Sequence, residues 1–248
     1  MADTRARLER AGAELLAEAG GRSQRLDPVL PRTGGPAGNA RLTAWTGLLL
    51  LALFLAEIVT LLDVHGLISW HVGIGVLLVP PALLKTATTG WRIVRYYTRG
   101  VSYVSAGPPL AALRVLGPLV VATTLGLLGS GLVLIALGEQ RAQSGSVSVL
   151  GFRLDWVTLH QVLFVLWAVA TGLHVLARMV PAVQLAAGRR KEAAGPAGRV
   201  PGSAVRVAVL VLVLAVAGVT TALVLPAASS WQHEQFGGFD HDHRPARP

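Results

Sequence analysis

Four of the seven histidines lie in or beside long apolar stretches of the chain: His65, His71, His160 and His174. An ionisable side chain at membrane depth is costly, so it is treated as a functional candidate by default. Neutral imidazole is also a common axial ligand of haem iron. The alternative is that these histidines only bond neighbouring helices.

Two of these histidines, His160 and His174, are fourteen residues apart in one apolar stretch. Fourteen residues make nearly four whole turns of α-helix, so both side chains point to the same face. At about 1.5 Å per residue they are roughly 21 Å apart along the axis. That separation suits two cofactor sites stacked across a bilayer.

His71 has a possible partner in His160, because each lies a few residues inside the same end of its stretch. Two neutral imidazoles from two helices can hold a haem iron from both sides. Such a site leaves no open coordination position, which favours electron transfer over oxygen chemistry. Gly73 and Gly75 beside His71 leave room for a flat macrocycle, or simply for close helix packing.

His174 has no such partner in the sequence. The start of the first apolar stretch holds no histidine, and the residue at matching depth in the second is Lys85. His174 is therefore a single or vestigial metal ligand, a quinone contact or a packing residue. We interpret Lys85 as an anchor whose ammonium group snorkels to the membrane surface. His65 lies in a short turn and does not share the helix face of His71.

The elements that must position these histidines are five apolar runs, each long enough for the roughly 20 residues that a bilayer requires. Only 14% of the 248 residues are charged and 52% are hydrophobic, whereas a soluble domain carries roughly a quarter charged residues. The absence of cysteine excludes disulfides, Cys-ligated zinc and iron–sulfur clusters. We expect an all-α integral membrane bundle with spans at 42–62, 68–88, 110–137, 156–180 and 205–226.

The positive charges alternate between the two ends of these runs. Seven arginines precede the first run, and further clusters follow the second and the fourth. The opposite ends carry few: Arg141, Arg153, Arg244 and Arg247. The positive-inside rule places the N-terminus in the cytoplasm and the C-terminus outside a plasma membrane. Topology thus explains the net charge of +9, and no nucleic-acid partner is expected.

The histidine pattern resembles a known family. The segments are Trp70-His-Val-Gly-Ile-Gly, Leu159-His-Gln and Gly172-Leu-His-Val. They are similar to the four-helix membrane cytochrome b subunits of formate dehydrogenase and nickel–iron hydrogenase, over roughly residues 42–181. The segment from His71 onwards also looks like actinobacterial cytochrome b-like proteins. The resemblance implies that His71 and His160 hold an outer haem b and that His174 belongs to an inner one, whose first-helix histidine this chain lacks.

The expected organisation is a four-helix cytochrome b-like core with a fifth, C-terminal transmembrane helix. We expect a membrane-bound b-type cytochrome, at most an electron-transfer subunit of an oxidoreductase, with a quinone and an extracytoplasmic redox subunit as partners. The alternatives are a haem-free scaffold or assembly protein and, ranked third, a transporter. The expected segments are a cytoplasmic, largely disordered 1–41, the core 42–181, a cytoplasmic linker 182–204, the fifth helix 205–226 and an extracytoplasmic tail 227–248.

Overall fold

Five helices of this chain are long and apolar enough to cross a membrane. The computed structural model describes residues 2–22, 26–108, 110–149, 151–188 and 200–231. This part of the chain is mostly helical, as predicted, and it fits a multi-pass membrane protein. The five helices are α2 (Gly35–Thr60), α3 (Ile68–Tyr97), α5 (Ala111–Leu137), α7 (Trp156–Ala186) and α8 (Ser203–Val224).

Each helix begins close to its predicted span or before it, and several extend beyond the apolar run. α2 starts at Gly35 because Gly34 adopts a left-handed conformation (φ 79°) and Pro36 occupies the first turn, where proline is tolerated. α3 continues through an arginine-rich stretch to Tyr97. Short 3₁₀ segments, η1 (Leu61–Asp63) and η2 (Leu225–Trp231), extend α2 and α8. The apolar runs therefore locate the spans correctly but underestimate the lengths of the helices.

The remaining elements lie at the two ends of these helices. The N-terminal segment contains α1 (Ala2–Ala19), and α2 also begins within it. α4 (Val101–Ser105) follows α3, and α6 (Glu139–Ser144) follows α5. A hairpin of β1 (Ser146–Val149) and β2 (Phe152–Asp155), which was not predicted, leads into α7. The tail from residue 232 and residues 189–199 of the expected linker lie outside the described residues.

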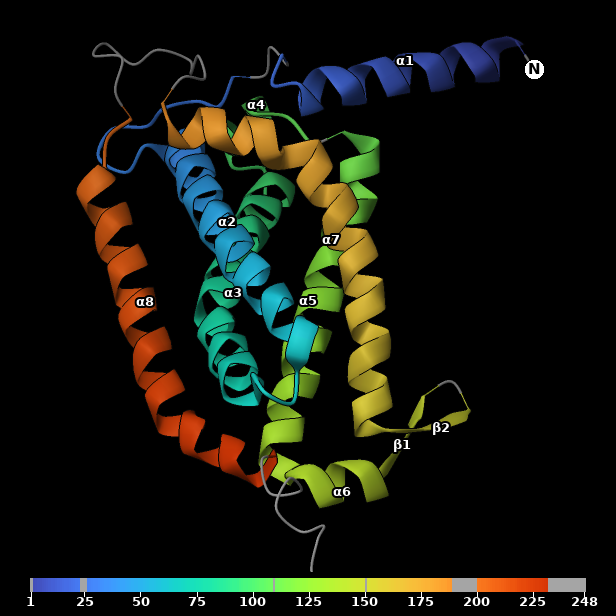
Figure 1. Cartoon of the computed structure of the whole chain (residues 1–248). Helices are drawn as coiled ribbons and strands as arrows, with labels where there is room; N and C mark the ends of the chain where they lie inside the picture. The colour runs from blue at the N-terminus through green and yellow to red at the C-terminus, as the bar shows by residue number, and fades with distance from the viewer. Residues whose placement is uncertain (1, 23–25, 109, 150, 189–199, 232–248) are drawn as a thin grey trace, which may run out of the picture.

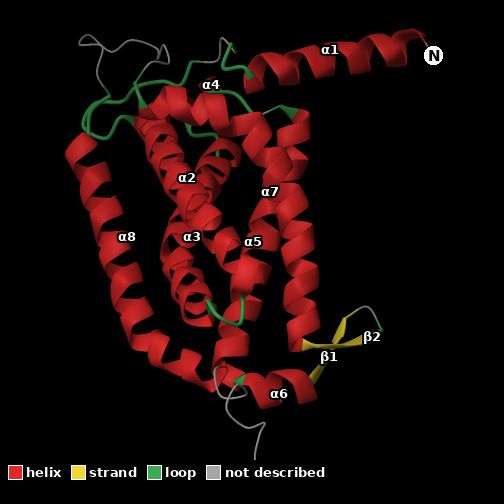
Figure 2. Cartoon of the chain, viewed as in Figure 1, coloured by secondary structure: helices red, strands yellow, loops and turns green. Residues whose placement is uncertain are grey.

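The long helices pack side by side in a bundle (Figure 1). α2 packs on α3 and α7, and α5 packs on α7 and α3, so that α3 and α7 face each other diagonally. α8 packs along α3, and η2 crosses beneath α3 and α5. One end of the bundle carries the β-hairpin and the other carries α1 (Figure 2). We call these the hairpin end and the α1 end.

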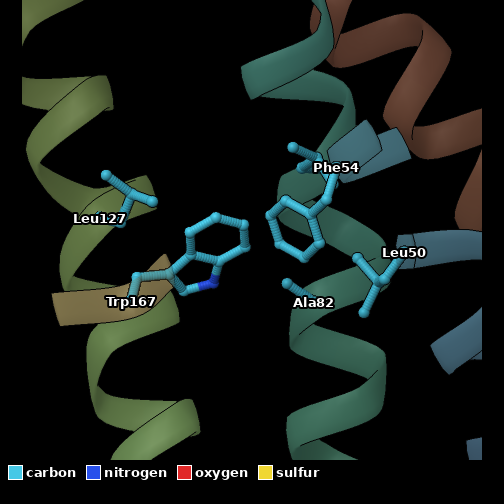
Figure 3. Packing of buried hydrophobic residues seen from close by; sticks show 6 residues of the cluster. Leu50, Phe54, Ala82, Leu127 and Trp167 are labelled. Atoms are coloured by element: carbon cyan, nitrogen blue, oxygen red, sulfur yellow. The ribbon is translucent and has the colours of Figure 1, made fainter. Parts of the chain in front are cut away.

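The centre of the bundle is an aromatic and aliphatic cluster to which four helices contribute (Figure 3). The ring centroids of Phe54 and Trp167 are 4.6 Å apart, and Leu78 is almost fully buried. The outward faces of α7 and α8 are instead lined by exposed Val and Leu side chains. An apolar exterior of this kind is what lipid contact requires. The buried cluster comprises Leu50, Phe54, Leu78, Ala82, Leu127 and Trp167.

Candidate functional site

His71 and His160 lie together near the hairpin end of the bundle. His71 is the fourth residue of α3 and His160 is the fifth residue of α7, and both helices begin at this end. Their ring centroids are 6.4 Å apart and the ring planes are nearly perpendicular, at 89°. The two imidazoles come from diagonally opposed helices, so they meet inside the bundle rather than on its lipid-facing surface.

Ser130 of α5 is the hydrogen-bond partner of His160. The Ser130 hydroxyl donates to the carbonyl of Leu127, at 2.9 Å. Its oxygen lies 2.8 Å from Nδ1 of His160. With the hydroxyl hydrogen on the Leu127 carbonyl, Ser130 accepts from Nδ1–H of a neutral His160, and Nε2 keeps its lone pair.

His71 is held in the same way, with one acceptor more. Thr60 donates its hydroxyl hydrogen to the carbonyl of Glu57, at 2.6 Å. Nδ1 of His71 lies 3.0 Å from that hydroxyl oxygen and 2.9 Å from Oε1 of Glu57. Both atoms accept, so Nδ1 of His71 is also a donor and its Nε2 also keeps a lone pair. The other carboxylate oxygen, Oε2 of Glu57, is buried without a partner.

The donor atoms of the pair are of the kind that holds a metal between two histidines. Metal-binding histidines usually donate their second ring N–H to a neighbouring acceptor, and both Nδ1 atoms here have an oxygen partner. Within the described residues, neither Nε2 makes a hydrogen bond. Two nitrogen–metal bonds of about 2 Å, plus the distances from the nitrogens to their ring centres, come to about 6 Å. The centroid separation of 6.4 Å is close to that sum.

Glycines near the pair have different neighbours. A Cβ atom on Gly131 would lie 3.3 Å from Cε1 of His160, so this glycine lets the ring approach α5. Gly75 faces Oε1 of Glu57, whereas Gly73 faces Leu225 in η2. Of the two glycines predicted to line a cofactor, Gly75 therefore lies beside the pair's hydrogen-bond network and Gly73 beside the C-terminal segment.

The hydroxyl partners of the pair, Ser130 and Thr60, were not predicted from the sequence. Ser130 lies between Gly129 and Gly131, and this run of small residues is a signal of close approach by a neighbouring helix. Thr60 is the last residue of α2 and has no comparable signal. We name the five residues Glu57, Thr60, His71, Ser130 and His160 the histidine-pair cluster.

His174 lies two turns beyond Trp167 on α7, apart from the histidine pair. Its Nδ1 is buried and has no hydrogen-bond partner. Within the described ranges no group of three histidine or acidic side chains could hold a metal ion. The charged neighbours that act on His174 are Lys85 and Arg178. His65 is exposed in the turn before α3, and the tail histidines lie outside the described residues.

Lys85 is turned into the bundle rather than along the helix to the membrane surface. Its ammonium group donates to the carbonyl of Thr43 in α2, at 3.1 Å. A Cβ atom on Gly47 would lie only 2.7 Å from the Lys85 nitrogen, so Gly47 provides the space for it. The snorkelling interpretation therefore gives way to a buried link between α2 and α3.

The start of α7, which positions His160, is fixed by Asp155. The Asp155 carboxylate accepts from the backbone N–H of Thr158 at 2.8 Å and from its hydroxyl at 2.7 Å. This is an N-cap, which satisfies a free N–H group of the first turn. The Thr158 hydroxyl and then its backbone N–H lower the pKa of the Asp155 carboxyl below its ordinary value.

No protein-family model matches the chain, and no curated protein or solved structure shows detectable similarity to it. The function is therefore argued from the residues and geometry of the site.

Proposed function

We propose that this chain is a membrane-bound b-type cytochrome that passes electrons between a quinone pool and an extracytoplasmic redox partner. One haem b would be held by His71 and His160. The observation that carries the proposal is the pair of imidazoles whose Nδ1 atoms are hydrogen-bonded and whose Nε2 lone pairs remain, at a centroid separation of 6.4 Å. When bound, the haem supplies one-electron transfer at its iron.

The chain's own residues orient the two imidazoles and exclude other chemistry. Ser130 and the pair Glu57 and Thr60 accept from the Nδ1–H groups, which fixes both tautomers and increases ligand basicity. With both imidazoles bound to the iron, no coordination position would remain for oxygen or substrate. The apolar cluster around Trp167 keeps water away from one side of the pair.

The arrangement of the helices supports a four-helix cytochrome b-like core formed by α2, α3, α5 and α7, with α8 added on the outside of α3. Arginines are concentrated at the α1 end, which by the positive-inside rule is cytoplasmic in a plasma membrane. The histidine pair then lies on the extracytoplasmic side, where it could exchange electrons with a partner subunit. The proposal uses one haem, because no described histidine ring faces His174 as His160 faces His71.

The test is a reduced-minus-oxidised absorbance spectrum of the full-length protein, expressed with haem supplied and purified in detergent. We expect a b-type spectrum in the wild type and its loss in His71→Ala and His160→Ala. His65→Ala, which alters an exposed turn residue, should keep the spectrum. A colourless wild-type preparation with a normal thermal transition would reject the proposal.

A haem-free scaffold is the second candidate, because both Nδ1 hydrogen bonds also suit histidines that only join helices. The same preparations separate the two. A scaffold would remain folded and colourless in the wild type and would lose stability, with no spectral change, when the histidines are replaced.

A further inference from the structure

A second group of polar side chains lies on the α1 side of the central apolar cluster. Trp167, Thr171 and His174 follow one another on α7 at spacings of four and three residues, so they share one helix face. Nε1 of Trp167, Oγ1 of Thr171 and Nδ1 of His174 are all buried, and all lack a hydrogen-bond partner. Buried polar groups are rarely left unpaired in native proteins, so three on one face need an explanation.

Lys85 lies at the level of these side chains. Ala82 packs with Trp167 in the central cluster, where the nitrogen-bearing edge of the indole is turned toward Ala82 (Figure 3). α3 and α7 both begin at the hairpin end, so the next turn of each brings Lys85 and Thr171 to a similar level of the bundle. Lys85 and Arg178 are charged neighbours of His174. We name Lys85, Trp167, Thr171 and His174 the lysine cluster.

The lysine cluster has more donors than acceptors. An ammonium group carries three N–H donors, and Lys85 uses one on the carbonyl of Thr43. The indole of Trp167 can only donate, and Thr171 and His174 can each donate one hydrogen. Glu18 binds Arg178 at 2.6 Å, toward the α1 end. Among the described residues, no contact joins a carboxylate to Lys85, Trp167, Thr171 or His174.

We propose that the lysine cluster binds a small monoanion, a halide or a short carboxylate. The Lys85 ammonium would supply the opposite charge, and Trp167, Thr171 and His174 would supply neutral hydrogen bonds, which are strongest when the acceptor is ionised. Gly47 leaves the ammonium the space it occupies beside α2. The site needs no haem and does not involve the histidine pair.

The experiment measures the thermal transition of the purified full-length protein in chloride, formate or acetate, compared with gluconate at the same ionic strength. A ligand that binds only the folded state raises the midpoint with its concentration, and equal ionic strength cancels screening. We expect chloride, formate or both to raise the wild-type midpoint. Lys85→Met should remove the rise, whereas Arg95→Gln, an equal charge change elsewhere on α3, should keep it.

A second variant covers the case in which Lys85→Met does not fold. Thr171→Val keeps the side-chain shape and removes one donor, so apparent anion affinity should fall about tenfold, a usual loss for a hydrogen bond to a charged group. Bromide should also quench a fluorescence component that Trp167→Phe removes. Midpoints equal in all anions and gluconate, or a rise unchanged in Lys85→Met and Thr171→Val, would overturn the proposal. His71→Ala should keep the anion response. The anion proposal and the haem proposal can therefore fail independently of each other.

Discussion

The histidine-pair cluster and the lysine cluster are built on the same two helices but differ in how their polar groups are satisfied. At the hairpin end both Nδ1 atoms have acceptors within 3.0 Å. From Trp167 toward the α1 end, three buried polar atoms of α7 have none. Trp167 belongs to the central apolar cluster and lies seven residues from His160 and seven from His174, so this cluster lies between the two histidines.

The difference comes from the neighbouring helices rather than from α3 and α7. Beside the histidine pair, α2 provides Glu57 and Thr60, and α5 provides Ser130. Beside the lysine cluster, α2 offers Lys85 only the backbone carbonyl of Thr43. A histidine becomes a defined ligand when a neighbour fixes its tautomer, and a polar site without such neighbours is completed by something from outside the chain.

The largest expected difference between the two regions is in haem binding. His160→Ala should abolish the b-type spectrum, because no other described side chain pairs with His71 in this way. His174→Ala, made on the same face of the same helix, should leave the amplitude of the spectrum unchanged. Haem content per protein, measured by pyridine haemochrome, gives the comparison. Equal losses in both variants would contradict a single haem held by His71 and His160.

Replacing Ser130 tests whether the fixed tautomer matters. Ser130→Ala leaves the Nδ1–H of His160 without its acceptor and lets the ring rotate. Loss of such a supporting hydrogen bond typically weakens metal binding by about 10- to 100-fold. Haem dissociation rates, followed by transfer to apomyoglobin, should rise accordingly. Ser144→Ala, an exposed position in α6, should leave the rate unchanged.

Replacing Thr60 should have a smaller effect, because His71 has a second acceptor in Glu57. In Thr60→Val the carboxylate still fixes the tautomer, so we expect haem dissociation to increase less than about tenfold, below the range for Ser130→Ala. The double variant Thr60→Val with Glu57→Leu should match or exceed Ser130→Ala. Equal effects of the Thr60 and Ser130 single variants would contradict this order.

The sequence predicted the five spans because hydrophobicity acts over whole segments, and it predicted that His71 and His160 lie at one depth. The helix ends were harder to predict. α3 continues past the apolar run because backbone hydrogen bonds do not require apolar side chains. Arg92 lies in this extension and binds Asp27. The hairpin at residues 146–155 was missed, although Ser-Val alternation before Gly151, at φ 85°, is a signal for it.

The hydroxyl partners of the site could not be predicted from the sequence because they depend on how helices face one another. Thr60 contacts His71 only because α2 and α3 pack together. Ser130, seventy residues later in the chain, contacts His160 from α5. Lys85 was interpreted by its distance from the predicted membrane boundary. Its actual contact is set by Gly47, whose missing side chain admits the ammonium group.

The unpaired groups of the lysine cluster should cost stability when no anion is present. Thr171→Val replaces a buried hydroxyl without a partner by a methyl group of similar shape. Leaving such a group unsatisfied costs about 1–3 kcal/mol, so in gluconate the variant should unfold at a higher temperature than the wild type. Thr60→Val, which removes a bonded hydroxyl, should unfold at a lower temperature. Equal shifts of one sign would remove the distinction between the clusters.

The smallest effect is expected at Asp155, which lies outside the membrane span and caps the helix that carries His160. The bonds from Thr158 lower the folded-state pKa of this carboxyl. A depressed pKa means that the stabilisation is present above the unfolded pKa and is lost as the pH falls through the folded value. The thermal midpoint of the wild type should therefore fall slightly in acid. The midpoint of Asp155→Asn should not show this fall, because asparagine caps the helix without titrating. Asp155→Ala should be less stable than both at neutral pH. Because the cap lies five residues before His160, Asp155→Ala should also perturb the spectrum of the haem and leave the anion response unchanged. An unchanged haem spectrum would mean that the start of α7 does not position the histidine pair.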